Sequence, residues 1–456
     1  MKKKLAIYFA LLSSLFVAVS CSSSEEELYE LSPYAMVKSF RIGNIRSSYP
    51  SFTSTGEDTL VVRTVSMERF GFTIDQASGR IYNNDSLPYA TNVSRVVTSF
   101  SVDGVLSIYV DSLDSYEYMS TTDSIDFTSP RKLRVYAADA QYYKDYTVSV
   151  NVHQVEPEMM VWNRYQAVEG VSPVRAVELA GRMYLFGTDA DGAPVVAVTA
   201  AESEPDWSVS AVSGLPAGAD LGTVQLFRDV FYAVADGDIY SSVDGIVWSF
   251  ASAGAGAAAI IGASDVDGKL WIAGEQGIYF SENGSEFTFS ESLPVDFPLY
   301  GISLASYPLN HNKNIIRYML VGYANEDKSG EPEVWSRLST EDEWTNYKNE
   351  DNKYACPALK GLAVVRYDGF LYAIGGAGKV NGFDVEAFKS FYISKDNGIA
   401  WKTATGFYQR LPKELFGSNA PFAVTVDSNN FMWIINSGSD GAVWKGIINR
   451  LGFERK

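Results

Sequence analysis

The sequence has few of the residues that most often bind metals or act as catalytic bases. Its 456 residues include two histidines, His153 and His311, and two cysteines, Cys21 and Cys356. Zinc and copper sites are built mainly from histidine and cysteine, and a Ser-His-Asp triad needs a histidine base. We therefore expect no cofactor and no metal site built from histidine or cysteine.

Basic residues are also in the minority. Lysine and arginine number 37 against 55 aspartates and glutamates, and the formal net charge is −18. Nucleic acids bind proteins through clustered lysine and arginine that neutralise phosphates. The charge balance therefore argues against a nucleic-acid partner.

The first twenty residues have the layout of an export signal. Lysines at positions 2–4 precede a mostly apolar run that is too short to span a bilayer comfortably. The run ends in Ala18-Val19-Ser20-Cys21, which resembles the bacterial lipobox, although Ala18 stands where that motif prefers leucine. The sequence predicts a signal peptide over residues 1–20 and a lipid anchor on Cys21. The other cysteine, Cys356, would then have no partner for an intrachain disulfide.

An acidic segment follows the predicted anchor. Residues 21–27 read Cys-Ser-Ser-Ser-Glu-Glu-Glu. This segment resembles the signal that sends lipoproteins of the Bacteroidota to the outer face of the outer membrane; the alternative is a solvated linker. We therefore expect the protein in the outer membrane, lipid-anchored and facing the cell exterior.

Residues 28–155 have the alternating pattern of β-strands rather than a helical period. The clearest strand is Tyr146–His153, in which apolar and polar residues alternate, and a hairpin partner lies at Leu133–Ala137. This pair resembles the closing hairpin of immunoglobulin-like domains, which need about seven strands. Further strand-like segments lie at 37–42, 59–65, 70–74, 96–102 and 106–110. We expect an immunoglobulin-like β-sandwich, followed by a linker punctuated by Pro157.

Residues 156–456 contain an internal repeat. A short apolar strand, usually with a tyrosine or tryptophan, recurs six times at intervals of roughly 40 to 60 residues. The copies begin at Met183, Phe231, Leu270, Tyr318, Leu371 and Met432. Each is followed by another strand, and in five copies by an aromatic residue that introduces a fourth: Trp207, Trp248, Phe287, Trp344 and Trp401. This pattern predicts a six-bladed β-propeller.

The sixth copy ends too early to supply its own fourth strand. The segment Met160–Tyr165, which includes Trp162, has the character of the missing strand. Closing the ring with strands from both ends of the propeller sequence would remove an exposed sheet edge. The fold class is therefore all-β, with an immunoglobulin-like β-sandwich followed by a six-bladed propeller.

Motifs within the repeats resemble known propeller families. The segment Ser394–Trp401 matches the Asp-box, Ser-x-Asp-x-Gly-x-x-Trp, of sialidase-like propellers, and Ser242–Trp248 and Ser281–Phe287 are shortened versions. Gly375-Gly376 is similar to the diglycine of kelch repeats. The whole plan resembles an uncharacterised family of Bacteroidota surface lipoproteins with an immunoglobulin-like domain and a kelch/Asp-box propeller. The Asp-box resemblance implies structural roles for Ser394, Asp396, Gly398, Trp401, Ser242, Asp244, Gly245 and Trp248.

No catalytic set accompanies these motifs. A sialidase also needs three converging arginines, a tyrosine nucleophile and a Phe/Tyr-Arg-Ile-Pro motif. The nearest match, Phe40-Arg41-Ile42-Gly43, lacks the proline and precedes the propeller. We therefore predict no catalytic residues. Catalysis by carboxylates from different blades stays open as an alternative, because sequence spacing cannot show which of them come together.

A short motif recurs in the N-terminal region. Asp-Ser/Thr-aliphatic triplets resemble the O-glycosylation acceptors of the Bacteroidota. The candidate acceptor residues are Thr59, Ser86, Ser112 and Ser124.

These features predict a non-catalytic surface module that binds a glycan or a protein. Aromatic side chains suit sugar rings and protein interfaces. Tyr300, Phe407 and Tyr408 are aromatic residues in predicted loops. One alternative is a hydrolase or lyase that acts on glycans through carboxylates on a propeller face. Another is a structural component of an envelope complex.

Overall fold

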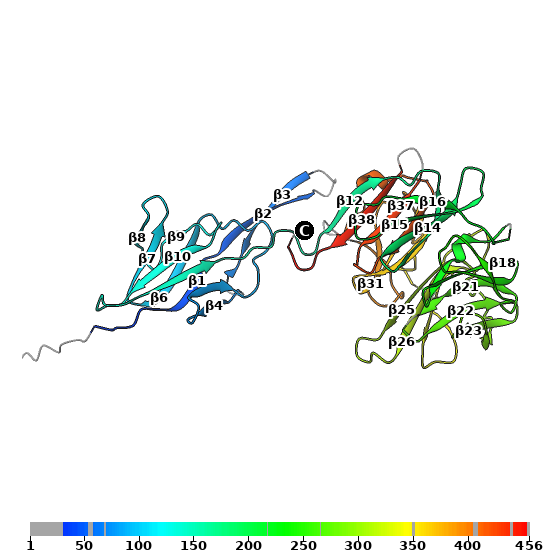
Figure 1. The fold of residues 1–456 in the computed structure, drawn as a ribbon, viewed down its shortest axis with the longest axis horizontal. Coiled ribbons are helices and arrows are strands. Elements are labelled where there is room, and N and C mark those ends of the chain that lie inside the picture. Colours follow the sequence, from blue (N-terminus) through cyan, green and yellow to red (C-terminus); the bar gives the residue numbers. More distant parts are fainter. Residues whose placement is uncertain are drawn as a thin grey trace, which may run out of the picture. The chain divides into compact units, whose positions relative to one another are not determined.

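The computed structural model describes residues 31–52, 58–67, 70–216, 218–264, 266–348, 352–404, 409–437 and 441–453. The chain divides into two compact units between Gln154 and Val155. Both are built from strands (Figure 1), which confirms the all-β fold class. Among the described residues, no helix is long and apolar enough to cross a membrane.

The N-terminal unit contains two sheets that enclose one core, and a separate hairpin. One sheet has the order β4 (Phe72–Asp75), β5 (Arg80–Asn83), β11 (Tyr143–Ser149), β10 (Arg131–Tyr136), β7 (Val105–Val110) and β8 (Ser115–Tyr118). The other has the order β1 (Met36–Ile42), β6 (Val96–Asp103) and β9 (Ser124–Ile125). The hairpin is formed by β2 (Ile45–Phe52) and β3 (Asp58–Val65). Each predicted strand overlaps an observed one, and the immunoglobulin-like relationship stays a prediction.

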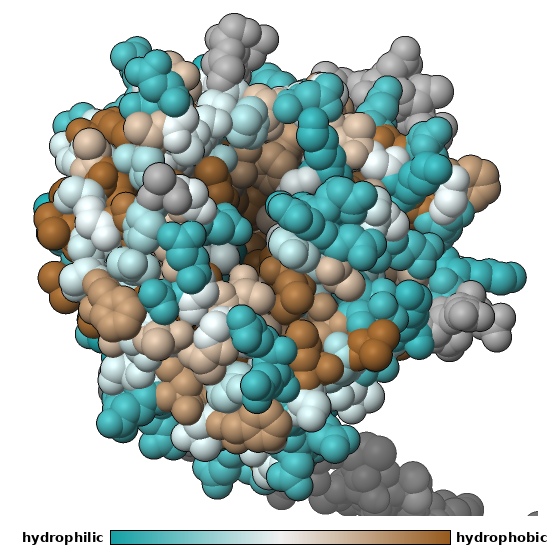
Figure 2. Space-filling view, turned by 90° about the vertical axis from the view of Figure 1, so that its right-hand side faces the viewer, coloured by the Kyte–Doolittle hydropathy of each residue, from teal (hydrophilic) through white to brown (hydrophobic). Residues whose placement is uncertain are grey.

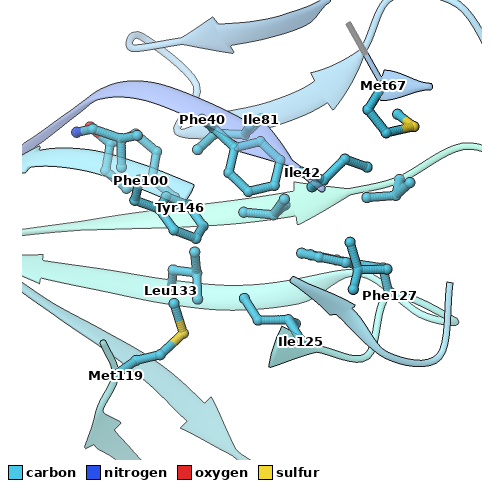
Figure 3. Packing of buried hydrophobic residues seen from close by; sticks show 14 of the residues in the cluster. Phe40, Ile42, Met67, Ile81, Phe100, Met119, Ile125, Phe127, Leu133 and Tyr146 are labelled. Carbon is cyan, nitrogen blue, oxygen red and sulfur yellow. The ribbon is translucent and has the colours of Figure 1, made fainter. Parts of the chain in front are cut away.

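The core of this unit follows from the period-two pattern of its strands. Leu133 and Val135 on β10, and Tyr146 and Val148 on β11, alternate with more exposed neighbours. Figure 3 shows side chains from both sheets meeting in this core, with Phe40 among them. The buried hydroxyl of Tyr146 donates a hydrogen bond to Gln76 Oε1 (2.6 Å) and accepts one from the backbone N–H of Val37 (3.1 Å). Its polar group is therefore satisfied inside the core.

The C-terminal unit is a β-propeller, and the described residues form six four-stranded sheets, or blades. The first two blades are β13 (Ser172–Leu179), β14 (Arg182–Thr188), β15 (Pro194–Ala200) and β16 (Ser208–Ala211), then β17 (Gln225–Phe227), β18 (Val230–Ala235), β19 (Asp238–Ser242) and β20 (Ser249–Ser252). The next two are β21 (Ala257–Ser264), β22 (Lys269–Gly274), β23 (Gly277–Ser281) and β24 (Thr288–Ser292), then β25 (Tyr300–Pro308), β26 (Ile316–Tyr323), β27 (Glu333–Leu338) and β28 (Thr345–Asn346).

The fifth blade has the order β30 (Ala363–Tyr367), β31 (Phe370–Ile374), β34 (Tyr392–Ser394) and β35 (Lys402–Thr403). A small sheet of β29 (Ala358–Leu359), β32 (Gly378–Val380) and β33 (Phe383–Val385) accompanies it. The sixth has the order β36 (Phe422–Val426), β37 (Met432–Asn436), β38 (Ala442–Ile448) and β12 (Met160–Gln166). The predicted closing strand is confirmed, because Met160–Gln166 pairs along the whole of β38.

The six recurring apolar segments of the sequence form the second strand of each blade. Trp271 on β22 and Trp433 on β37 show why these segments stand out, since both side chains are fully buried. The predicted aromatic residues directly precede the fourth strands, and Trp248, Trp344 and Trp401 among them are buried. Local hydrophobicity therefore marks the strands that are covered on both faces.

The direction of the strands defines two ends of the propeller. Neighbouring strands within a blade are antiparallel, and the first strand of each blade lies innermost, in contact with the first strands of adjacent blades. We call the end at which these first strands begin the entry end, and the other the far end. Turns between third and fourth strands therefore lie at the far end. So does Met160, because β12 is the fourth strand of its blade. The linker before Met160 thus joins the propeller at the far end.

Candidate functional site

The innermost strands surround a cavity of about 760 Å³ at the entry end. Every blade contributes to its wall, including the start of β13, the η2 turn (Leu221–Thr223), Ile260 of β21, the start of β25, and the segments 358–363 and 418–424. Figure 2 shows a hollow in one face of the propeller, with hydrophobic residues gathered in it and hydrophilic residues around it. A cavity of this size holds a small molecule or one or two sugar units of a longer chain.

Irregular strands shape this cavity. The pairing register of β13 shifts between Pro173 and Arg175, which makes Val174 an extra residue in the innermost strand. Similar shifts occur in β21 and β25. A β-bulge bends its strand and redirects the side chains beside it. Three of the innermost strands therefore depart from regular pairing where they border the cavity.

Charged side chains occupy the wall and the rim. Arg175 is half-buried, whereas Asp220, Asp327, Lys328 and Lys360 are exposed. Asp220 Oδ1 accepts a hydrogen bond from the backbone N–H of Gly222 at 2.8 Å. Asp327 Oδ1 accepts one from the backbone N–H of Ser329 at 3.1 Å. Hydrogen bonds from the Ser329 side chain and backbone lower the pKa of Asp327, so this carboxylate stays ionised.

Two aromatic residues border the same space. Tyr323 is buried, and its hydroxyl donates a hydrogen bond to the carbonyl oxygen of Leu359 at 3.1 Å. Burial raises the pKa of Tyr323, so its hydroxyl stays neutral and holds the β29 segment. Phe422 is half-buried and packs edge-on against Phe388, with ring centroids 4.8 Å apart. Phe422 therefore offers the cavity an aromatic surface held by a buried neighbour.

The turn matched by the Asp-box motif lies at the far end, away from this cavity. Ser394 Oγ accepts a hydrogen bond from Gly398 N at 2.8 Å and donates one to Asp396 Oδ1 at 2.8 Å. Asp396 Oδ1 also accepts from Ala400 N at 2.9 Å. The indole N–H of Trp401 donates to the carbonyl oxygen of Gly398 at 3.0 Å, and the ring is buried. The side chains of the motif thus stabilise the turn by hydrogen bonds to its own backbone.

The shortened motif repeats these contacts. Ser242 Oγ accepts from Gly245 N at 2.9 Å, and Trp248 Nε1 donates to the carbonyl oxygen of Gly245 at 3.0 Å. Asp244 Oδ1 accepts from two backbone N–H groups. Gly245 has a φ of +73°, and a Cβ there would lie 3.1 Å from the ring of Phe186. Glycine is therefore required for both the conformation and the close packing.

The two histidines and Cys356 are not among the residues that line the cavity. His311 is exposed, His153 belongs to the N-terminal unit, and Cys356 is a buried free thiol. Burial alone raises the pKa of Cys356. Across the described parts of the chain, no group of three or more His, Cys, Asp or Glu side chains could hold a metal ion.

The glycosylation candidates lie in the N-terminal unit. Ser112 and Ser124 are exposed, whereas Thr59 and Ser86 are half-buried. Thr59 belongs to β3 and Ser124 to β9, while Ser112 lies in the turn after β7. An exposed hydroxyl in a turn is the easiest of these for an enzyme to reach. O-glycosylation stays a prediction for all four.

Other predicted features fall outside the described residues. These are the signal peptide over residues 1–20, the acidic segment with Cys21, and the aromatic pair Phe407 and Tyr408. Tyr300 is described; it begins β25 and packs against buried residues of the fourth and fifth blades. Its ring therefore serves the core at least in part.

Sequence reasoning missed the cavity. Arg175, Asp220, Asp327 and Phe422 are far apart in the chain and share no motif. One local signal was present, because Arg175 interrupts an apolar segment that precedes the first repeat and becomes an innermost strand.

Family comparison gives matches to both units. The model described as the DUF6242 beta propeller domain matches residues 156–456. The model described as the domain of unknown function (DUF6242) N-terminal domain matches residues 40–150. A search of curated proteins found no match.

The chain also matches solved structures at low sequence identity and low TM-score. A DUF4623 family protein from Bacteroides eggerthii DSM 20697 is 11% identical, with 91% of this chain and 98% of that chain covered and a TM-score of 0.35. The BP39L lectin from Burkholderia pseudomallei is 12% identical, with 90% and 97% covered and a TM-score of 0.35. A Trichoderma reesei protein of Carbohydrate-Active Enzymes Family AA12 is 9% identical, with 63% and 95% covered and a TM-score of 0.37.

Proposed function

This chain belongs to the DUF6242 family, and we propose that it is a surface lipoprotein whose propeller binds a glycan or a protein in its central cavity without converting it. The observation that carries the proposal is the cavity of about 760 Å³ enclosed by all six blades. Its lining combines apolar residues such as Val174, Ile260 and Ile302 with polar and charged side chains, as ligand sites do.

The position of the cavity suits a tethered binding protein. The linker joins the propeller at the far end, where the backbone N–H of Val155 also bonds the carbonyl oxygen of Gly452 at 3.2 Å. The cavity opens at the opposite, entry end, and the residues by which the linker joins β12 do not line it. Ligand could enter the cavity while the protein stays tethered.

Catalysis by a carboxylate pair has weaker support. Glycoside hydrolysis needs one carboxylic acid with a raised pKa beside an ionised carboxylate. Asp327 has a lowered pKa, and Asp220 caps the η2 turn. Both rim carboxylates thus have backbone partners that favour a structural role.

A glycan array with a parallel reducing-sugar assay tests the proposal. The wild type should bind at least one glycan or surface protein without product formation. Ala420→Trp should weaken that binding at least tenfold, because Ala420 lines the cavity and a large ring would occupy it. Val243→Trp is the matched control, since Val243 is 74% exposed at the far end.

Three results would contradict the proposal. Turnover of a captured glycan would make the protein an enzyme. Equal binding by the wild type and Ala420→Trp would move the site away from the cavity. Stable co-purification with outer-membrane proteins, without affinity for any ligand, would instead support a structural component of an envelope complex.

The location of the protein needs its own test in the native host. Replacement of Cys21 by serine should release the protein from the membrane fraction, because lipidation requires the thiol. Protease added to intact cells should digest the wild-type propeller. Its protection would contradict an outward-facing anchor.

A further inference from the structure

Arg175 stands out among the charged residues of the propeller. It follows Val174, the extra residue of the β13 bulge, and pairs in register with Phe186 of β14. The bulge changes the direction of the side chains at this point of the strand. Arg175 lines the central cavity, whereas Arg182 at the start of β14 does not.

Among the described residues, the Arg175 guanidinium has a buried N–H group that lacks a hydrogen-bond partner. Its Nε atom is buried without a hydrogen bond, and its side chain has no ion pair within the described ranges. Burial lowers the pKa of Arg175, yet a guanidinium stays protonated in proteins. Keeping a partly buried guanidinium unpaired is costly unless an anion compensates it.

The charged side chains that line the cavity are positive in sum. Lys328 and Lys360 also border the cavity and add positive charge, while Asp220 and Asp327 sit at the rim with hydrogen bonds from backbone N–H groups. The cavity wall therefore carries three basic and two acidic side chains in a protein whose net charge is −18. An anion would therefore be attracted to the cavity wall near Arg175, whereas the rest of the acidic protein would repel it.

Two further groups suit a sugar ring. Phe422 presents an aromatic ring against which the apolar face of a sugar can pack, and its edge-on contact with Phe388 holds it in place. Asn419, exposed on the neighbouring segment, offers a carboxamide that can both donate and accept hydrogen bonds. Guanidinium, aromatic ring and carboxamide together match the carboxylate, ring face and hydroxyls of a sugar acid.

We propose that Arg175 anchors the carboxylate of an acidic saccharide, such as a uronic acid unit, in the central cavity. This inference rests on the proposed function and names the ligand class of the same site. Arginine binds carboxylates through two parallel hydrogen bonds. A guanidinium without an ion pair at the cavity wall is available for such a contact with a ligand.

Titration calorimetry with matched small probes tests this inference. Glucuronate and an oligoglucuronate should bind the full mature chain, and glucose should bind at least tenfold more weakly. Arg175→Gln should lower the glucuronate affinity at least tenfold, and Arg175→Lys should restore part of it. Arg182→Gln is the control, because Arg182 is exposed at the start of β14, at the far end.

Thermal unfolding separates a ligand role from a structural one. Arg175→Gln should leave the melting temperature unchanged or raise it, since it removes a partly buried charge that has no ion pair among the described residues. A marked fall would indicate that Arg175 supports the fold and would contradict the inference.

Other outcomes overturn the inference without touching the proposed function, or overturn both. An acidic-saccharide site is refuted if glucose and glucuronate bind with equal affinity, or if glucuronate does not bind at millimolar concentration. It is also refuted if inorganic sulfate, or a peptide carboxylate such as N-acetyl-dialanine, binds more tightly than glucuronate. If Ala420→Trp still prevents the binding of the ligands found on the glycan array in those cases, the cavity remains the binding site. If Ala420→Trp also has no effect, the proposed function fails as well.

Discussion

At the scale of single residues, the same hydrogen-bonded turn appears in different blades with different side chains. Asp244 Oδ1 accepts from the backbone N–H groups of Ile246 (2.8 Å) and Val247 (2.9 Å). Asn283 Oδ1 makes the equivalent bonds to Ser285 and Glu286. An amide oxygen can therefore accept the same two hydrogen bonds in this turn. The negative charge of Asp244 strengthens them and adds to the stability of the fold.

That difference makes stability depend on pH. The backbone hydrogen bond from Val247, followed by that from Ile246, lowers the pKa of Asp244. A group whose folded pKa is depressed stabilises the fold above its unfolded pKa, and this contribution is lost as the pH falls through the folded value. Asp244→Asn should therefore melt about 1–4 °C below the wild type at pH 7, for a loss of up to about 1 kcal/mol.

The gap should shrink toward zero as the pH falls below the ordinary aspartate value of 3.8. Scanning calorimetry from pH 7 to pH 3 measures it. Asp384→Asn is the control, because Asp384 is exposed and makes no hydrogen bond or ion pair within the described residues. A gap that stays constant over this range would show that charge plays no part in the turn.

At the scale of elements, the closing strand β12 joins the two ends of the propeller sequence. Its Trp162 ring packs near Phe391, with centroids 6.4 Å apart, and Trp162 Nε1 donates to the carbonyl oxygen of Arg410 at 2.6 Å. A Cβ on Gly446 of the paired strand β38 would lie 2.5 Å from this ring. The ring therefore fills a space that only glycine leaves open.

Loss of this contact should weaken the whole ring. Trp162→Ala should destabilise the propeller by about 2–4 kcal/mol, because it removes a large packed side chain and a hydrogen bond. Gly446→Ala should also destabilise it by forcing the ring away. Urea unfolding measures both. Val161→Ala, at a neighbouring site that is 40% exposed, should change stability by less than about 0.5 kcal/mol. Equal effects of the three variants would mean that β12 does not close the ring through Trp162.

The elements also show why sequence reasoning succeeded for the blades and failed for the cavity. Second strands such as β22 bury Leu270, Trp271 and Ile272 in succession, so their hydrophobicity is continuous and repeats along the chain. The cavity depends instead on single residues such as Arg175 and Phe422, which come together only when the ring closes. Bulges in the innermost strands leave no periodic signal. A local pattern can therefore predict blades but not the site between them.

At the scale of the whole molecule, the two units have separate cores. The N-terminal core is built from residues before the linker, including Phe100, and the propeller clusters are built from residues after it, including Trp271. Each unit should therefore unfold on its own, as expected for domains with independent cores.

Calorimetry of the mature chain should show two transitions. Phe100→Ala should lower one of them by several degrees, for a loss of about 3–5 kcal/mol, and leave the other in place. Trp271→Ala should do the reverse. A single transition that moves with both substitutions would contradict independent units.

The central claim is that the propeller binds its ligand at the entry end, in the cavity bordered by Arg175. The most direct measurement is a crystal structure of the mature chain soaked with an oligoglucuronate. The account predicts density in the central cavity, with a carboxylate within hydrogen-bond distance of the Arg175 guanidinium and a sugar ring against Phe422. Density on another surface of the propeller or on the N-terminal unit, with an empty cavity, would contradict it.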